Sequence, residues 1–251
     1  MTNIFLGYLS WKSPKNLKKS LETHRNNGLH DMICKRVIYF NEISQEDIEI
    51  ASEYNCEYIG TTANIGIGLA KRELLKLCIE GDYEMFCFIE CDFHMNVNSI
   101  DIFSECIDLI KEGIFDYVYL RDGRDPGMPF GLYGERRKSL QLGHGLLPHL
   151  WHDRAIKYAE YLKTDLNMFA ICSSRYQKFS NQTYILSKRV YDKVLVGLKN
   201  NPQTGENELT EYLRDHEIKM AYGHNGVFKH NRDENEHPEN RMRSKKLSKK
   251  Y

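Results

Sequence analysis

The chain has 251 residues, 41% of them hydrophobic, and its 35 basic and 35 acidic side chains cancel at neutral pH. This composition excludes a disordered protein and predicts a sizeable core, as one large domain or one and a half. No apolar run approaches the roughly 18 residues of a membrane span, and the first residues lack the features of a signal peptide, so we expect a cytoplasmic protein. The seven cysteines include no CxxC pair, which argues against a disulfide framework and against a zinc site.

In the first half of the chain, short apolar runs rich in β-branched and aromatic residues alternate with segments of helical periodicity. This alternation is typical of parallel strands joined by crossover helices. We expect strands at residues 4–9, 36–40, 57–59, 85–89 and 117–120. We expect helices from Ser13-Pro14 to Gly28, from Ser44 onward, over 65–79 and over 99–111. The sequence therefore predicts an α/β fold with a mixed, mainly parallel central sheet flanked by helices.

The second half of the chain is less regular. Residues 121–150 are rich in glycine and proline, and their aromatic and leucine side chains favour an ordered lid or binding loop over a linker. After them we expect a helix near 153–162, a strand at 184–186, helices at 188–198 and 206–216, and a strand at 220–222. The polar composition beyond residue 230 predicts a loosely attached tail. We therefore expect a single domain over 1–230, with halves at 1–120 and 121–230, and a basic tail over 231–251.

Two carboxylates follow the apolar strand expected at 85–89. Side chains at i and i+2 of an extended chain point to the same side, so Glu90 and Asp92 would aim into one small volume. Two like charges that close raise one pKa unless a cation neutralises them. Ligands of doubly wound sheets bind beyond the carboxyl ends of the strands. We therefore expect a divalent metal with a phosphorylated ligand, while the alternative, a solvated acidic turn, is disfavoured by the flanking apolar residues.

Glu90-Cys91-Asp92 resembles the Asp-x-Asp motif of the GT-A glycosyltransferases, which ends a central strand and holds a metal against the diphosphate of a nucleotide sugar. The first residue departs from that motif, because Glu90 stands in place of Asp. The opening strand and the stretches 37–42 and 62–71 resemble further segments of the family in the same order, so the resemblance covers residues 3–120. It implies a GT-A fold and assigns donor binding to Leu9, Ser10, Asn41, Glu42, Asn64, Gly66, Lys71 and Glu90, with Asp92 on the metal.

Several of these residues have simpler interpretations. Asn64 and Gly66 are residue types that cap helices. Lys71 could be a solvated helix residue, and Glu42 an ordinary loop acid. The order of the segments along the chain favours the resemblance over these alternatives.

Two segments of the second half resemble the same family. The helix that opens at Glu206 resembles the one whose acid removes the acceptor proton in inverting members, which implies Glu208, or Glu206 in its place, as catalytic base. Residues 226–230 resemble the closing segment in which a histidine completes the metal site, which implies His230 as a ligand. The resemblance thus implies a Mn²⁺ or Mg²⁺ cofactor and a nucleotide-sugar donor, with UDP-glucose as the preferred candidate. A helix-dipole role for the acids, a structural histidine and a retaining mechanism stay open.

Two basic segments bear on the acceptor. Arg136, Arg137 and Lys138 form one, and residues 241–250 hold six basic side chains and no acid, a composition that suits phosphate backbones but also a solvated loop and tail. The general character of the N-terminal segment resembles phage enzymes that add sugar to hydroxymethylcytosine or glucosyl-hydroxymethylcytosine in DNA, which implies DNA as acceptor and the host cytoplasm as location. The alternatives are a glycosyltransferase that builds a surface or capsid glycan and a non-catalytic nucleotide- or nucleic-acid-binding module. No obligate protein partner is indicated.

Overall fold

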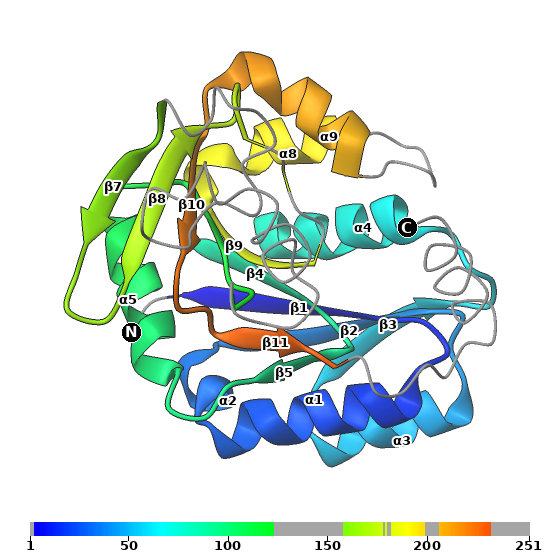
Figure 1. Ribbon diagram of the computed structural model, residues 1–251. Coiled ribbons are helices and arrows are strands. Elements are labelled where there is room, and N and C mark those ends of the chain that lie inside the picture. The colour runs from blue at the N-terminus through cyan, green and yellow to red at the C-terminus, as the bar shows by residue number, and fades with distance from the viewer. Residues whose placement is uncertain (1–2, 123–157, 178, 180–181, 199–205, 232–251) are drawn as a thin grey trace, which may run out of the picture.

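The computed structural model describes residues 3–122, 158–177, 179, 182–198 and 206–231 (Figure 1). The strands are β1 (Ile4–Ser10), β2 (Lys35–Asn41), β3 (Glu57–Thr61), β4 (Met85–Glu90), β5 (Phe93–Met95), β6 (Tyr117–Tyr119), β7 (Glu160–Lys163), β8 (Met168–Ser173), β9 (Thr183–Ser187), β10 (Lys219–Gly223) and β11 (Phe228–His230). The helices are α1 (Pro14–Asn26), α2 (Leu29–Met32), α3 (Gln45–Glu53), α4 (Ile67–Glu80), α5 (Ile100–Lys111), α8 (Tyr191–Gly197) and α9 (Glu206–Leu213), with 3-10 turns η2 (Lys188–Val190) and η3 (Arg214–His216).

The described strands form one large sheet and one small one. Nine of them lie in the order β3-β2-β1-β4-β9-β6-β10-β8-β7, and β5 pairs with β11 separately. Strands β1 to β4 are parallel, and β6 is parallel to β10, whereas β9 runs against β4 and β6, and β8 runs against β10 and β7. The predicted mixed, mainly parallel sheet is confirmed.

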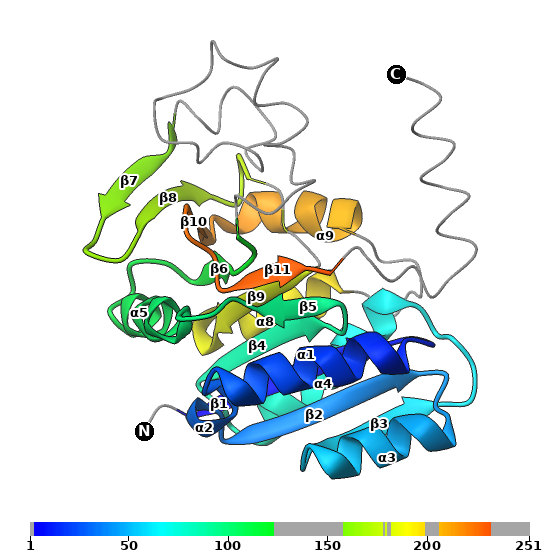
Figure 2. The ribbon, with the colours of Figure 1, turned by 60° about the horizontal axis from the view of Figure 1, so that its bottom comes forward.

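Helices cover both faces of the large sheet (Figures 1 and 2). Helices α1, α3 and α5 pack on one face, and α4, α8 and α9 pack on the other, so two apolar cores form. Strand β4 contributes side chains to both cores, because successive side chains of a strand point to opposite faces. Cys87 and Ile89 lie in the first core, and Phe86 and Phe88 lie in the second.

The predicted starts of the helices at Ser13-Pro14 and at Ser44 are confirmed. Pro14 occupies the first turn of α1, and Ser44 caps the N-terminus of α3 through a reciprocal capping box with Asp47. Among the helices that the structure describes, none combines the length and the apolar character of a membrane-spanning segment.

The helix predicted near residues 153–162 is wrong over residues 160–162, although Tyr158 is helical. Residues 160–162 belong to β7, which pairs with β8 at the edge of the sheet, and the part before residue 158 lies outside the described residues. The run Glu160–Lys163 is too short to show a period of its own, so the pairing with β8 decides its conformation. Strand β8 was not predicted, because a short apolar run does not separate strand from helix.

Candidate active site

The strands that carry the predicted residues end at one edge of the sheet. Leu9 lies beside Glu90 in the pairing of β1 with β4, and Ser10 lies beside Phe40, so Asn41 comes one residue later at the same edge. Strand β6 runs in the same direction and ends there too, and β9 begins there because it is antiparallel. The carboxyl edge of a parallel sheet is where ligands of such folds bind.

Asn41 and Asn64 are joined directly by a hydrogen bond. Asn41 Nδ2 donates to Asn64 Oδ1 at 2.8 Å, and Asn41 Oδ1 accepts from the backbone N–H of Ile65 at 2.7 Å. Asn64 Oδ1 also accepts from the N–H of Gly66 at 2.8 Å. Gly66 has φ +86°, a conformation that glycine adopts without strain, and it is the N-cap residue before α4. These bonds fix the loop before α4 to the end of β2, with Asn41 buried and Asn64 exposed.

Glu42 links the loops that follow β1 and β2. Its carboxylate accepts from Lys12 Nζ at 2.7 Å and from Trp11 Nε1 at 3.3 Å. The hydrogen bond from Lys12 has the larger effect on the pKa of Glu42, and both hydrogen bonds lower it. Glu42 has φ +89°, an uncommon conformation for a residue with a side chain, and Lys12 has φ +48°. Glu42 is therefore more constrained than an ordinary loop acid, and it keeps Trp11 beside the carboxyl edge.

Lys71 is fully buried in α4, so the solvated interpretation of this residue is wrong. Its ammonium lies 4.3 Å from the centroid of the Phe88 ring and 5.3 Å from that of Tyr184, within the range of cation–π attraction. Burial raises the pKa of Tyr184 well above its usual value, and the Glu90 carboxylate adds to this rise. Lys71 and Glu90 thus both lie near Tyr184, on the α4 side of the sheet.

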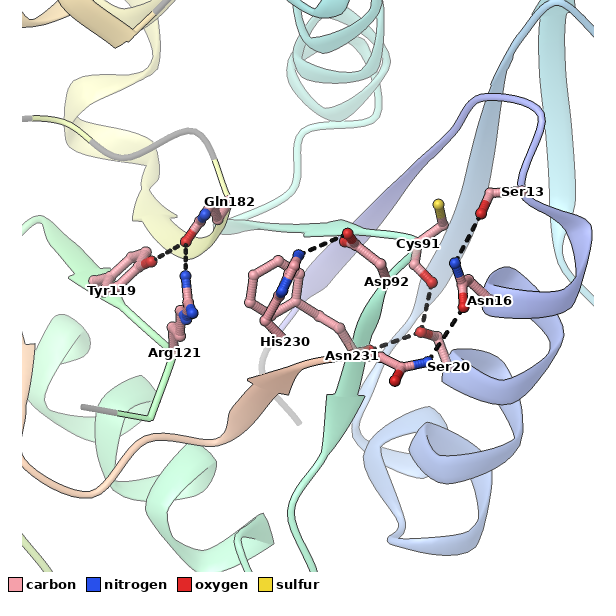
Figure 3. Close-up of polar contacts among 11 residues, drawn as sticks. Ser13, Asn16, Ser20, Cys91, Asp92, Tyr119, Arg121, Gln182, His230 and Asn231 are labelled. Carbon is pink, nitrogen blue, oxygen red and sulfur yellow. Dashed lines mark hydrogen bonds and ion pairs between the residues drawn. The ribbon is translucent and has the colours of Figure 1, made fainter. Parts of the chain in front are cut away.

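Asp92 and His230 are in direct contact, although 138 residues separate them in the chain. His230 Nε2 lies 2.8 Å from Asp92 Oδ2 (Figure 3). Strand β4 ends at Glu90, so Asp92 belongs to the turn before β5, and the turn rather than strand alternation directs its side chain. His230 ends β11, which pairs with β5 and so comes next to this turn. The structure therefore brings together the two predicted metal ligands.

The pair has the chemistry of a partial metal site. Two ligand atoms at about 2.1 Å from a metal and at right angles lie about 3.0 Å apart, close to the separation of Asp92 Oδ2 and His230 Nε2. Asp92 Oδ1 is buried and has no hydrogen-bond partner among the described residues. No group of three or more His, Cys, Asp or Glu side chains is placed to hold a metal in the described part of the chain. Two protein ligands fit a divalent ion that takes its other ligands from diphosphate and water.

Three polar residues near this pair were not predicted. Gln182 Oε1 accepts hydrogen bonds from Tyr119 Oη and from Arg121 Nη1, the latter at 2.8 Å. The Arg121 guanidinium lies 5.7 Å from the centroid of the Phe93 ring, and that ring packs edge-on against His230 (Figure 3). Arg121 is 5% exposed. The only sequence signal is that Arg121 and Gln182 adjoin strands at the carboxyl edge.

Gly226 explains how β11 approaches this edge. A Cβ at Gly226 would lie 2.2 Å from the backbone nitrogen of Asp122 and 2.3 Å from the carbonyl carbon of Arg121, so only glycine fits. Val227 follows with an N–H bond to the carbonyl of Leu120 at 2.7 Å. This close approach brings His230 toward Asp92.

The acceptor-side predictions are only partly within the described residues. Glu208 is exposed in the first turn of α9, and the beginning of α9 points to the side on which β2 and β3 end in both ribbon views (Figures 1 and 2). Glu206 begins the same helix. Arg136, Arg137 and Lys138, and the tail from residue 232, lie outside the described residues.

Comparisons with known proteins find the fold but no family by sequence. No protein-family model matches the chain, and no curated protein matches it either. Among solved structures, residues 1–349 of S. aureus TarS in complex with UDP-GlcNAc match with a TM-score of 0.61 and 13% identity over 94% of this chain and 60% of that one. TarS 1–349 in complex with UDP matches with a TM-score of 0.56, 11% identity, and coverages of 91% and 60%. The chain thus spans about 60% of the TarS segment and has the same GT-A type of fold.

Proposed function

We propose that the chain is a metal-dependent glycosyltransferase that moves a hexose from a nucleotide sugar to an acceptor hydroxyl. The observation that carries this proposal is the contact of Asp92 with His230 at the carboxyl edge of a GT-A sheet. The adjoining constrained polar loops at Asn41, Glu42 and Asn64 support it.

Each residue has a distinct part in the proposed reaction. Asn41, Glu42 and Asn64 bind the nucleoside side of the donor. Asp92 and His230 hold the Mn²⁺ or Mg²⁺ ion, which when bound neutralises the charge of the departing diphosphate. Glu208 accepts the proton of the attacking hydroxyl.

UDP-glucose is the proposed donor, and UDP-GlcNAc is the natural second candidate because a TarS structure contains it. The proposed acceptor is hydroxymethylcytosine or glucosyl-hydroxymethylcytosine in DNA. The basic residues Arg136, Arg137 and Lys138 and the basic tail support this choice. A surface or capsid glycan is the alternative acceptor.

The first experiment measures hydrolysis of UDP-glucose and UDP-GlcNAc in the presence of Mn²⁺. We expect turnover that Asp92→Asn abolishes, because the amide loses the charge that holds the ion. Asp101→Asn, at an exposed position in the first turn of α5, is the control and should leave turnover unchanged. Undiminished turnover in Asp92→Asn would contradict the metal site, and UDP binding without turnover of any donor would favour the non-catalytic module.

The second experiment identifies the acceptor. DNA that contains hydroxymethylcytosine or glucosyl-hydroxymethylcytosine, and a set of oligosaccharides, are incubated with each donor and analysed by mass spectrometry. A mass increase of one hexose on the DNA alone supports the DNA acceptor. An increase on an oligosaccharide alone supports the glycan alternative.

A further inference from the structure

Helix α1 buries a stripe of polar side chains. Asn16, Ser20 and His24 follow one another at intervals of four, which places them on one face of the helix. Asn16 is 5% exposed, and Ser20 and His24 are completely buried. A helix that only docked on the sheet would bury apolar residues at these positions, because buried polar groups need hydrogen-bond partners. The hydrogen-bond partners of these three side chains therefore show which part of the fold they hold in place.

Ser20 and His24 bind the backbone of the turn that carries Asp92. Ser20 Oγ lies 2.7 Å from the carbonyl oxygen of Cys91 and 2.8 Å from that of Phe93, and its single hydrogen is shared between them. His24 Nε2 lies 3.0 Å from the carbonyl oxygen of Phe93. A carbonyl only accepts, so this nitrogen carries the proton. Carbonyls on both sides of Asp92 are thus tied to α1.

The same stripe reaches the segment that carries His230. Asn16 Oδ1 accepts from Asn231 Nδ2 at 3.2 Å, and Asn16 Nδ2 donates to Ser13 Oγ at 3.0 Å (Figure 3). The backbone N–H of Asn231 donates to the carbonyl of Asp92 at 2.7 Å. One helix face therefore contacts the residues that adjoin both proposed ligands, which lie in segments far apart in the chain.

We propose that Asn16, Ser20 and His24 are positioning residues that hold Asp92 and His230 at ligand distance and so set the affinity for the divalent metal. The inference rests on the proposed function, since it concerns the same metal. Ser20 and His24 act through the backbone carbonyls on either side of Asp92, and Asn16 acts through the side chain of Asn231, the residue after His230. Loss of an outer partner of a metal ligand typically weakens metal binding about 10- to 100-fold.

The test measures Mn²⁺ affinity of the full chain by calorimetry in the presence of saturating UDP. We expect Ser20→Ala to weaken Mn²⁺ binding by about 10-fold or more. Ser174→Ala is the matched control, because Ser174 is equally buried and its hydroxyl donates to the carbonyl of Leu213 at 2.6 Å, on another part of the fold. Thermal unfolding of both variants separates a loss of stability from a loss of affinity.

A second pair of variants guards against a failure of Ser20→Ala to fold. His24→Gln retains an N–H donor in place of Nε2 and should keep most of the Mn²⁺ affinity, whereas His24→Leu removes the donor and should not. Wild-type affinity in Ser20→Ala and His24→Leu, or an equal loss in Ser174→Ala, would overturn the positioning role and leave the proposed function intact. Absence of Mn²⁺ binding in the wild type, or a wild-type Mn²⁺ affinity in Asp92→Asn, would contradict the metal site and the positioning role together.

Discussion

Glu208 is the residue on which the proposed proton transfer depends. It lies exposed in the first turn of α9, where an acid can act as a catalytic base or can stabilise the helix N-terminus. A general base contributes about 10²- to 10⁴-fold to the rate, whereas a helix-dipole contact contributes only about 0.3–1 kcal/mol of stability. We therefore expect Glu208→Gln to lower kcat of sugar transfer by about 100-fold or more with little change in donor KM.

Steady-state kinetics with the identified acceptor check this prediction. Glu211→Gln changes an exposed acid on the same helix and should retain the wild-type kcat. A loss of activity in Glu206→Gln but not in Glu208→Gln would move the base to Glu206. Full activity in both would remove the base from α9 and favour a retaining mechanism.

At the scale of elements, α1 and α2 dock on β1 through two neutral histidines. Tyr8 Oη lies 2.9 Å from His24 Nδ1 and 3.3 Å from His30 Nε2. Burial, and then the charges of Arg36 and Arg25, lower the pKa of His30 to about 4, and burial lowers the pKa of His24 well below its usual value. Between pH of about 6.5 and 4 the unfolded chain therefore takes up protons that the folded chain does not. The free energy of unfolding must fall as the pH falls through this window.

Chemical denaturation at pH 7, 6 and 5 tests this dependence. We expect His30→Gln to flatten the slope of unfolding free energy against pH by about 1 kcal/mol per pH unit, once solvent screening is allowed for. His216→Gln replaces a histidine that is not buried and serves as control. An unchanged slope in His30→Gln would show that His30 takes up its proton over the same pH range in the folded and the unfolded chain.

The elements differ in how far the sequence predicts them. Strands β1, β2 and β4 and helix α4 have strong local patterns, and their carboxyl edge follows from the parallel order. Strands β5 and β7 have only three and four residues, so their long-range pairing partners determine them. In the site, Asp92 and His230 were predicted from motifs. Arg121 and the polar stripe of α1 were not, because only the tertiary contacts distinguish a buried Ser20 from a solvated serine.

At the scale of the whole molecule, the net charge of zero hides an uneven distribution. The basic residues 136–138 and those of the tail are offset by acids elsewhere, so a local contact with DNA phosphates is compatible with neutrality. Each phosphate contact on double-stranded DNA contributes about 0.9 to the slope of log affinity against log salt concentration. The salt slope of DNA binding therefore measures the number of contacts between basic side chains and phosphates.

The proposed acceptor predicts a steep salt dependence of DNA binding. We expect the triple variant Arg136→Ala, Arg137→Ala, Lys138→Ala to reduce the slope by about 2–3, because three phosphate contacts are lost. The control replaces Lys18, Lys35 and Lys188 by alanine, since each of these already pairs with a carboxylate, and it should retain the slope. DNA affinity is measured by fluorescence anisotropy at salt concentrations from about 50 to about 200 mM, a range over which phosphate contacts change the affinity strongly. DNA affinity independent of salt would show that DNA binding releases no counterions. That result would contradict the phosphate contacts and favour the glycan acceptor.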